Sequence, residues 1–476
     1  MSDLGLSVPD IVGPIVRGLT WDGNAGAIVV SDSEAPRLNG QSAASPDESA
    51  AGPDEASEIS IVPPAKMDDT DAWIAALAEG MGNRREGVRE KPLRVRLESG
   101  ECFGVAGDPD AAAAAVRRYP FGGAAAGSGA RQGEGGAGSA EQRDARQAHV
   151  GMSAAHMAGR VCVVTGGAQG FGEQIVRSLC SVGANVVIAD LKMESARALS
   201  RELNTGLGKT ATIPVEVDVS DEASVRAMIS TVTGTLGGID LFVSNAGVLI
   251  AGSVKSLSYE NFRFVGSVNY DGFFLCTKAA SPVMALQFRA QRFLARRQFE
   301  SGQAGGSRGQ SSGAGSGPAA AGQAGADDGP AITEGPAITD GYMSDIVQIN
   351  SKSGLVGSNR NGAYAGSKFG AVGLVESFAL ELIEDGIKVN AICPGNFFDG
   401  PLWSDPEKGL FVQYLRAGKV PGAETIADVK RHYEQRVPMG RGCRGVDVAR
   451  ALFYIVDQRY ETGQAVPVTG GQVMLH

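Results

Sequence analysis

The feature that most constrains the fold is a regular alternation of short β-branched segments with amphipathic helical stretches, which begins at Arg160. Strands that alternate with helices predict βαβ units, and these build a parallel sheet covered by helices on both faces. We therefore expect an α/β fold with a doubly wound, Rossmann-like parallel sheet. The expected strands are VCVVTG, ANVVIAD, TIPVEVD, DLFVSNAG, DIVQINS and IKVNAICPG.

One low-complexity stretch interrupts this alternation, at about residues 301–341. It is rich in Gly, Ala, Ser and Pro, and it contains the near-duplicate GPAITEGPAITDG. Such a composition cannot bury a core, so we expect a disordered insertion. It joins the end of a helix to the start of the strand DIVQINS. Such connections lie at the amino ends of the strands, whereas ligands bind at the carboxyl ends. The insertion should therefore leave the active site open.

The first 150 residues are organised differently, and we expect a small α/β module over residues 1–121 followed by a flexible linker over residues 122–156. A Ser/Pro/Glu/Asp-rich stretch covers about residues 31–58, and no motif in the module indicates its role. The linker has almost no large apolar residue. The doubly wound domain then spans residues 157–476. The expected elements of the module are a strand in GAIVVSD, a helix AWIAALAEGM near Asp71, two strands in LRVRLESGECFGVAG and a helix in DPDAAAAAVRRYP.

Composition excludes several classes of protein. A formal net charge of -10 leaves no basic surplus for nucleic acid or an anionic membrane. The chain has neither a basic and apolar leader at its start nor an apolar run of membrane-spanning length, so we expect a soluble, cytoplasmic protein. Its six cysteines lack a C-x-x-C pair and read as reduced thiols. Its four histidines lack ligand spacing, so no metal site is expected.

A glycine-rich turn over residues 166–172 follows the first strand and precedes a helix that begins near Glu173. Glycines allow a tight turn and let a pyrophosphate approach the helix N-terminus, where free N–H groups favour anions. Asp190 ends the next strand at the separation typical of dinucleotide-binding folds. Its carboxylate can accept hydrogen bonds from ribose hydroxyls and would repel a 2'-phosphate. NAD is therefore favoured, although the nearby Lys192 leaves NADP open.

Tyr364 and Lys368 are four residues apart in a helical stretch, with Ser351 upstream at the end of a strand. Residues at i and i+4 share a helix face. A phenol with a pKa of about 10 is a poor acid–base catalyst, and lowering that pKa by roughly three units requires about 4 kcal/mol. An exposed pair supplies only a few tenths of a kcal/mol. Lys368 must therefore act in a water-poor cleft, helped by a positive nicotinamide ring.

These motifs resemble the short-chain dehydrogenase/reductase family over about residues 158–476, excluding the insertion. TGGAQGFG is similar to the family's TGxxxGxG cofactor loop, and SNAG to its NNAG strand end. SVNYDG places Asn269 where the family has its catalytic asparagine. The resemblance implies a nicotinamide-dependent oxidoreductase, with Tyr364 as proton donor or acceptor and Lys368 lowering its pKa and holding the nicotinamide ribose. Ser351 would orient the substrate oxygen, and Asn269 would position a proton-relay water.

The same resemblance implies a set of cofactor contacts, with two departures. Ser244 replaces the first asparagine of NNAG, and Asp399 stands where many members have a threonine that binds the nicotinamide amide. The implied contacts are Gly166, Gln169, Gly170, Phe171, Gly172, Asp190, Asp218, Val219, Asn245, Ala246, Gly247, Tyr364, Lys368, Pro394 and Gly395.

Within the family, QINSKSGLVGS, KFGAVGL, PMGRGC and TGQAVPVTGGQVML look most like members that interconvert sorbitol 6-phosphate and fructose 6-phosphate. Residues 394–442 would then form a substrate lid. Ser351, Lys352, Arg360 and Tyr364 are the expected substrate contacts, and we expect Arg441 and Arg444 near the cleft mouth. Another polyol, ketose or secondary alcohol stays open as substrate, as does a non-catalytic NAD-binding regulator. A homo-oligomer, dimer or tetramer, is expected.

Overall fold

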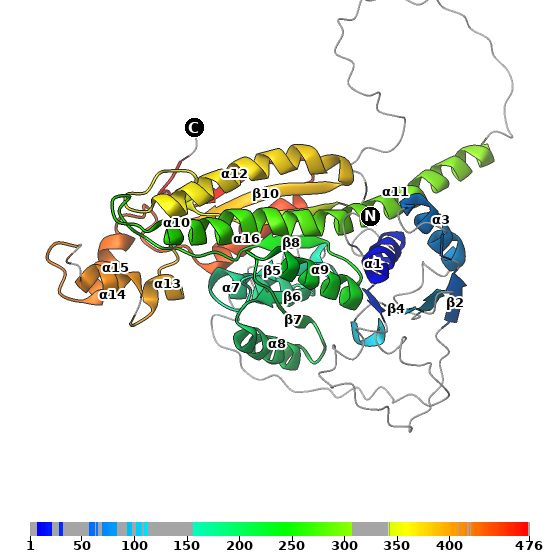
Figure 1. Ribbon diagram of the computed structural model, residues 1–476, viewed down its shortest axis with the longest axis horizontal. Coiled ribbons are helices and arrows are strands. Elements are labelled where there is room, and N and C mark those ends of the chain that lie inside the picture. Colours follow the sequence, from blue (N-terminus) through cyan, green and yellow to red (C-terminus); the bar gives the residue numbers. More distant parts are fainter. Residues whose placement is uncertain are drawn as a thin grey trace, which may run out of the picture.

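The computed structural model describes residues 7–20, 28–31, 57–61, 63–64, 69–82, 93–97, 101–106, 109–112, 156–306, 341, 343–407, 409–416, 418 and 420–474. A parallel sheet with strand order β11-β10-β9-β8-β5-β6-β7 forms the centre of the molecule (Figure 1). The six expected strands are confirmed, and β11 adds a seventh that the alternation did not predict. The strands are β5 (Val161–Thr165), β6 (Asn185–Asp190), β7 (Thr212–Glu216), β8 (Leu241–Ser244), β9 (Ser344–Ile349), β10 (Ile387–Pro394) and β11 (Ala465–Val468).

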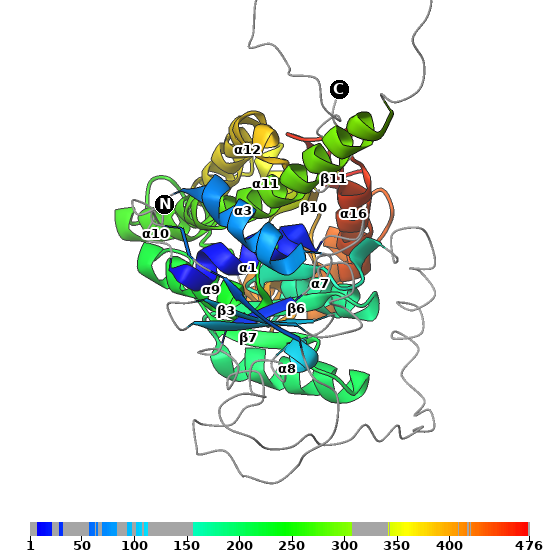
Figure 2. The ribbon, with the colours of Figure 1, turned by 90° about the vertical axis from the view of Figure 1, so that its right-hand side faces the viewer.

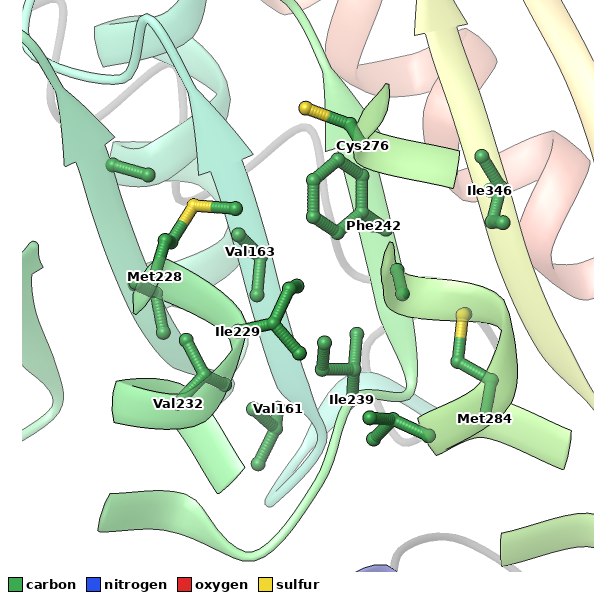
Figure 3. Packing of buried hydrophobic residues seen from close by; sticks show 14 of the residues in the cluster. Val161, Val163, Met228, Ile229, Val232, Ile239, Phe242, Cys276, Met284 and Ile346 are labelled. Carbon is green, nitrogen blue, oxygen red and sulfur yellow. The ribbon is translucent and has the colours of Figure 1, made fainter. Parts of the chain in front are cut away.

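Helices cover both faces of this sheet, which confirms the doubly wound fold. Strands buried on both faces must be apolar throughout, and this explains the continuous β-branched runs. On one face Ile229 of α9, Phe242 of β8 and Met284 of α11 belong to one packed cluster (Figure 3). The helices on that face are α9 (Glu222–Leu236), α11 (Gly272–Gly306) and α12 (Gly362–Leu382), and those on the other are α7 (Gly170–Ser181), α8 (Met193–Leu207) and α16 (Gly445–Asp457).

The direction of winding reverses next to β5. The chain builds β6 and β7 on one side of β5 and then returns to place β8 on its other side. In sheets of this kind a crevice opens where the winding reverses, outside the strand carboxyl ends. The segments that carry the expected site residues follow β5, β8, β9 and β10, so the topology brings them to one edge.

A small helical subdomain follows β10, where the lid was expected. It contains α13 (Pro401–Ser404), α14 (Leu410–Arg416) and α15 (Ile426–Glu434), and it lies at the left end of Figure 1. Its own apolar core is built around Phe398, Trp403 and Phe411, whose rings contact one another. This separate core lets the segment hold its shape beside the sheet.

In its described residues, the N-terminal module contains a four-stranded sheet with the order β1-β4-β3-β2 and the helices α1 and α3. The strand in GAIVVSD, the helix near Asp71 and the two strands of LRVRLESGECFGVAG are confirmed. Of the helix expected in DPDAAAAAVRRYP, only residues 109–112 are described, and they are helical. Two elements were not predicted, α1 and β2. The elements are α1 (Val8–Leu19), β1 (Ile28–Ser31), β2 (Ser57–Ile61), α3 (Thr70–Met81), β3 (Leu93–Leu97) and β4 (Cys102–Ala106).

The module packs against the amino edge of the parallel sheet, at the end of the molecule opposite the lid (Figures 1 and 2). Helix α1 contacts α9 and α11. A Cβ atom on Gly13 would lie 3.0 Å from the Cα atom of Gly237, so the glycine permits a close helix approach. Arg17 of α1 forms a buried ion pair with Asp240, the residue before β8. The module and the sheet therefore share buried contacts, polar as well as apolar.

The insertion begins later than expected. Helix α11 continues to Gly306, so residues 301–306 are helical, and residues 307–340 lie outside the described residues. Gln303 and Ala304 are compatible with a helix, but three of the six residues 301–306 are glycines, so this segment extends a helix that begins far upstream and does not form one by its own propensity. The insertion leads into the amino end of β9, whereas the expected site residues lie at the carboxyl ends of the strands.

Among the described residues, no helix combines the length and apolarity needed to cross a membrane.

Candidate active site

The glycine turn between β5 and α7 is shaped to receive an anionic group. Gly166 and Gly170 adopt φ angles of 61° and 62°, which glycine tolerates best. A Cβ atom on Gly172 would lie 2.0 Å from the Gly166 carbonyl oxygen, so no side chain fits there. Gln169 precedes α7 but makes no side-chain cap, so the first-turn N–H groups keep their capacity to bind an anion. These residues fit the pyrophosphate of a dinucleotide.

Thr165 fixes this turn against the end of β8. Its hydroxyl oxygen accepts the N–H groups of Asn245 and Ala246 at 3.0 and 3.1 Å. The Asn245 amide donates in return to the carbonyls of Thr165 and Gly166 at 2.9 and 3.0 Å. Asn245 and Ala246 were expected as cofactor contacts, whereas Thr165 was not. Its position as the first residue of TGGAQGFG is the signal that could have indicated it.

Asp190 braces the glycine turn from the end of β6. Its carboxylate accepts the N–H groups of Ala168 and Lys192 at 3.0 and 2.9 Å, and it is buried. A carboxylate offers about four acceptor positions, so these bonds leave capacity for hydroxyl groups. Lys192 extends instead to the Gln169 side chain, 3.1 Å away. The Asp190 carboxylate, which would repel a 2'-phosphate, and the Lys192 ammonium group, which would attract one, therefore lie on the same turn.

The remaining expected cofactor residues lie at the same sheet edge. Asp218 follows β7 and accepts the Ser220 N–H and hydroxyl groups at 2.9 and 2.6 Å, so its carboxylate closes a turn. Val219 is buried and packs beside Gly272, where a Cβ atom would lie 3.0 Å from the valine. Pro394 ends β10, and Gly395 donates to the Val468 carbonyl at 2.9 Å.

Ser351, Tyr364 and Lys368 converge beside the end of β9. Burial raises the pKa of the Tyr364 phenol, and a hydrogen bond with Ser351 opposes this rise only in part. The Lys368 ammonium donates to the Ile349 carbonyl at 3.0 Å and lies 5.8 Å from the Tyr364 ring centroid. Burial lowers the pKa of Lys368 to about 8. The structure therefore brings the expected trio together at one edge of the sheet.

The expected lowering of the Tyr364 pKa is not present in the protein alone. Burial disfavours the phenolate, and the same burial weakens the hold of Lys368 on its proton. The sequence predicts the lowering for a cleft that also holds a positive nicotinamide ring, so it stays a prediction for the enzyme with its cofactor. A bound oxidised nicotinamide would add a positive charge beside the phenol.

Asn269 connects three parts of the site. It lies in a π-helical turn (Ser267–Asp271), a rare element that is frequent at functional sites. Its side-chain oxygen accepts the Val248 N–H at 2.8 Å, and its amide donates to the Val248 carbonyl at 2.9 Å and to the Ser367 hydroxyl at 3.1 Å. The bond to α12 holds Asn269 near Tyr364 and Lys368. Ser367 was not predicted, because a serine inside the Tyr–Lys spacing carries no signal of its own.

The cations expected at the substrate end have different surroundings. Lys352 is half-buried directly after Ser351, and within the described part of the chain no hydrogen bond or ion pair engages its ammonium group. Burial lowers its pKa. Arg360 is exposed, and Arg444 is an exposed residue at the start of α16. Arg441 binds Asp447 through two bonds of 2.6 and 3.0 Å, so its guanidinium already has a carboxylate partner, and its place at the cleft mouth stays a prediction.

Asp399 departs from the family pattern, in which many members have a threonine at this position. It follows β10, is exposed, and its carboxylate pairs with the ammonium group of Lys430 of α15 at 2.8 Å.

All six cysteines are buried thiols. Over the described ranges, no group of three or more His, Cys, Asp or Glu side chains could hold a metal ion.

At one edge of the sheet, a glycine turn at a helix N-terminus lies beside a Ser–Tyr–Lys trio and an asparagine. This arrangement defines a nicotinamide-dependent oxidoreductase that acts on a CH–OH group. A model of the family described as short chain dehydrogenase matches residues 160–291 and 336–403. The chain belongs to the short-chain dehydrogenase/reductase family.

Named relatives share this assignment. Sorbitol-6-phosphate 2-dehydrogenase of Escherichia coli (strain K12) is 30% identical over 318 residues, which cover 66% of this chain and 99% of that protein. Trans-4-hydroxycyclohexanecarboxylate dehydrogenase of Sinomonas cyclohexanicum is 27% identical and covers 66% of this chain and 93% of its own length. The crystal structure of sorbitol-6-phosphate 2-dehydrogenase from Erwinia amylovora superposes with a TM-score of 0.51 at 32% identity, over 66% of this chain and all of that one.

Proposed function

We propose that this enzyme interconverts a sugar-alcohol phosphate and a ketose phosphate with NAD, and that sorbitol 6-phosphate and fructose 6-phosphate are the pair. The observation that carries the proposal is Lys352, a half-buried ammonium group beside Ser351 without a partner among the described residues. Burying a cation costs free energy unless an anion compensates it. A substrate phosphate would provide that compensation.

In the reducing direction, a nicotinamide bound in this site would supply the hydride that the carbonyl carbon receives. Tyr364 donates its phenolic proton to the carbonyl oxygen, which becomes the hydroxyl of the product. Ser351, which bonds the phenol, orients the same oxygen. Lys368 holds the nicotinamide ribose, and Asn269 positions the water through which the phenolate recovers a proton. Oxidation of the sugar alcohol uses the same groups in reverse.

The test of the substrate compares fructose 6-phosphate with fructose. A charge-assisted hydrogen bond contributes about 1.5 to 3 kcal/mol, which corresponds to roughly ten- to a hundredfold in binding. We expect kcat/KM for the phosphate to exceed that for fructose at least tenfold, and Lys352→Ala to shrink this ratio. Lys209→Ala, at an exposed lysine of the α8–β7 loop, is the control and should preserve it.

The same assay decides between substrate classes. A higher kcat/KM for fructose or for a simple ketone would refute the polyol-phosphate proposal. It would favour a dehydrogenase of another polyol, ketose or secondary alcohol, as the name of the 27% identical relative illustrates.

The choice of NAD rests on Asp190. Its buried carboxylate would repel a ribose 2'-phosphate and retains acceptor capacity for the ribose hydroxyls. We expect a higher kcat/KM with NADH than with NADPH, and a smaller preference in Asp190→Ser. Equal values in the wild type would refute this part of the proposal, for which Lys192 provides the alternative route.

We also propose that the enzyme is a cytoplasmic homo-oligomer, a dimer or a tetramer. Large apolar side chains are exposed on α11 and α12, among them Phe274 (42%), Phe369 (45%) and Leu380 (82%). Where large exposed apolar side chains gather on one face, they are typical of an interaction surface. Light scattering after size exclusion should give a multiple of the 49.0 kDa chain mass, and a monomer would refute this assembly. Six buried thiols suit a reducing compartment.

A further inference from the structure

Two phenylalanines from distant parts of the chain stack face to face at the active-site edge. The ring centroids of Phe171 and Phe397 are 4.4 Å apart, and the ring planes differ by 14°. Phe171 belongs to the first turn of α7, directly after the glycine turn. Phe397 belongs to the hinge that joins β10 to the helical subdomain. Both rings are half-buried.

The stack connects strands that are not neighbours. In the sheet, β8 and β9 lie between β5, which leads to Phe171, and β10, which leads to Phe397. Neighbouring strands are about 4.8 Å apart, so the two segments start roughly 14 Å from one another. The rings therefore bridge the carboxyl ends of β8 and β9. Asn245 and Ser351 follow those two strands, so the stack spans the part of the sheet edge from which the cofactor-loop and catalytic groups emerge.

The hinge holds Phe397 in this orientation. A Cβ atom on Gly400 would lie 2.4 Å from Cδ1 of Phe397, so the ring occupies the space that a side chain would need. The next residue, Phe398, instead packs edge-on against Trp403, with 5.0 Å between centroids, inside the core of the subdomain. Phe397 thus contacts the residue beside the glycine turn, while the next residue, Phe398, belongs to the core of the helical subdomain, which was expected to be the lid. Movement of the lid and separation of the stack are therefore linked.

We propose that Phe171 and Phe397 form an aromatic clasp that retains the bound dinucleotide. This inference rests on the proposed dinucleotide site at the glycine turn. A dinucleotide that lies along the strand ends can leave only when the segments on either side of the crevice separate, and the stack opposes that separation. The clasp therefore controls cofactor release, whereas Tyr364 and its neighbours perform the chemistry.

The test measures release of the reduced cofactor by the full chain. The complex with NADH, or with NADPH if that binds more tightly, is mixed rapidly with excess ADP-ribose, and the nicotinamide fluorescence is followed. Aromatic stacking contributes an amount equivalent to about 2- to 13-fold in an equilibrium constant. We expect Phe171→Leu and Phe397→Leu each to release cofactor about three- to tenfold faster. Because each substitution removes the same contact, the double variant should release it no faster than the single variants.

The matched control is Phe293→Leu, a half-buried phenylalanine of α11 that packs against the N-terminal module. It should release cofactor at the wild-type rate, and thermal unfolding checks that all variants fold. Wild-type release rates in both clasp variants, or effects that multiply in the double variant, would overturn the clasp. Failure of the wild type to bind either dinucleotide would instead refute the cofactor site itself, so the two failures are distinguishable.

Discussion

Arg17 of helix α1 and Asp240, the residue before β8, form an ion pair that is buried on both sides. Asp240 also accepts the Val161 N–H at 2.8 Å and the Gln287 amide at 3.1 Å, so one carboxylate joins the amino ends of β5 and β8 to α11 and α1. Burial alone would raise the pKa of Asp240, but the charges of Arg17 and Arg160 and the hydrogen bonds from Arg17 and Val161 together outweigh it, and the pKa is lowered. The N-terminal module therefore supplies the compensating charge for a carboxylate under the catalytic sheet.

Removing Arg17 should destabilise the whole enzyme. Arg17→Met leaves the buried Asp240 charge without its guanidinium, and breaking such a pair costs about 3 to 5 kcal/mol. Urea unfolding measures the loss. Arg177→Met, which removes partly exposed pairs with Glu173 and Glu202, should cost clearly less, about 1 kcal/mol.

The double variant Arg17→Met with Asp240→Asn tests the cause, since it removes both charges. It should recover part of the stability that Arg17→Met loses. If Arg17→Met and Arg177→Met lowered the free energy of unfolding by equal amounts, the buried pair would contribute no more to stability than the partly exposed one.

Replacing Tyr364 by phenylalanine should abolish proton transfer without affecting the cofactor. We expect turnover to fall by at least about a hundredfold, because a positioned acid–base group contributes roughly 10² to 10⁴. The dissociation constant for NADH should stay close to that of the wild type. Tyr454→Phe, at an exposed tyrosine bonded to Glu461 at 2.9 Å, is the matched control. A Tyr364 variant within tenfold of wild-type activity would place the proton transfer elsewhere.

The buried Lys368 predicts a pH dependence of stability in the absence of cofactor. Its pKa falls from 10.5 to about 8 on folding, so between these values the unfolded chain binds the proton that the folded protein has lost. Stability should therefore rise with pH across this window, by about 3 kcal/mol in total from this group. Below pH 8, Lys368 is charged in both the folded and the unfolded state, so the folded protein bears the full free-energy cost of burying its ammonium group.

Denaturant unfolding at several pH values between 7.5 and 10 measures this dependence, with Lys368→Met as reference. The stability of the wild type relative to this variant should increase steadily with pH. A constant difference would show that Lys368 retains its ordinary pKa when buried.

Shortening the insertion should leave catalysis unchanged. The segment joins the end of α11 to the amino end of β9, away from the carboxyl ends where Ser351 lies. Deletion of residues 310–336 changes loop-closure free energy by only about 1 kcal/mol or less. Steady-state assays should give kcat/KM within a few-fold of the full chain. A folded deletion variant without activity would assign the insertion a catalytic or assembly role.

The sequence by itself determined the doubly wound sheet, because its signals are local. Strands such as VCVVTG must be apolar on both faces, and the turn after that strand needs glycine for its backbone. Tyr364 and Lys368 share a helix face by spacing alone. Elements with mixed signals were missed. Helix α1 contains Pro9, Pro14 and two glycines, yet nearly all of it is buried against neighbouring helices, and tertiary packing overrides its weak propensity.

Only the tertiary structure decided how distant side chains are used. Arg441 looked available for a phosphate, but folding places Asp447 beside it. Thr165 opens the TGGAQGFG motif, but what its hydroxyl does depends on N–H groups at the end of β8, about eighty residues away. Phe171 and Phe397 are more than two hundred residues apart, and their rings meet although β8 and β9 lie between the strands that lead to them. Spacing along the chain reports local geometry, whereas charge compensation and ring stacking depend on which segments the fold brings together.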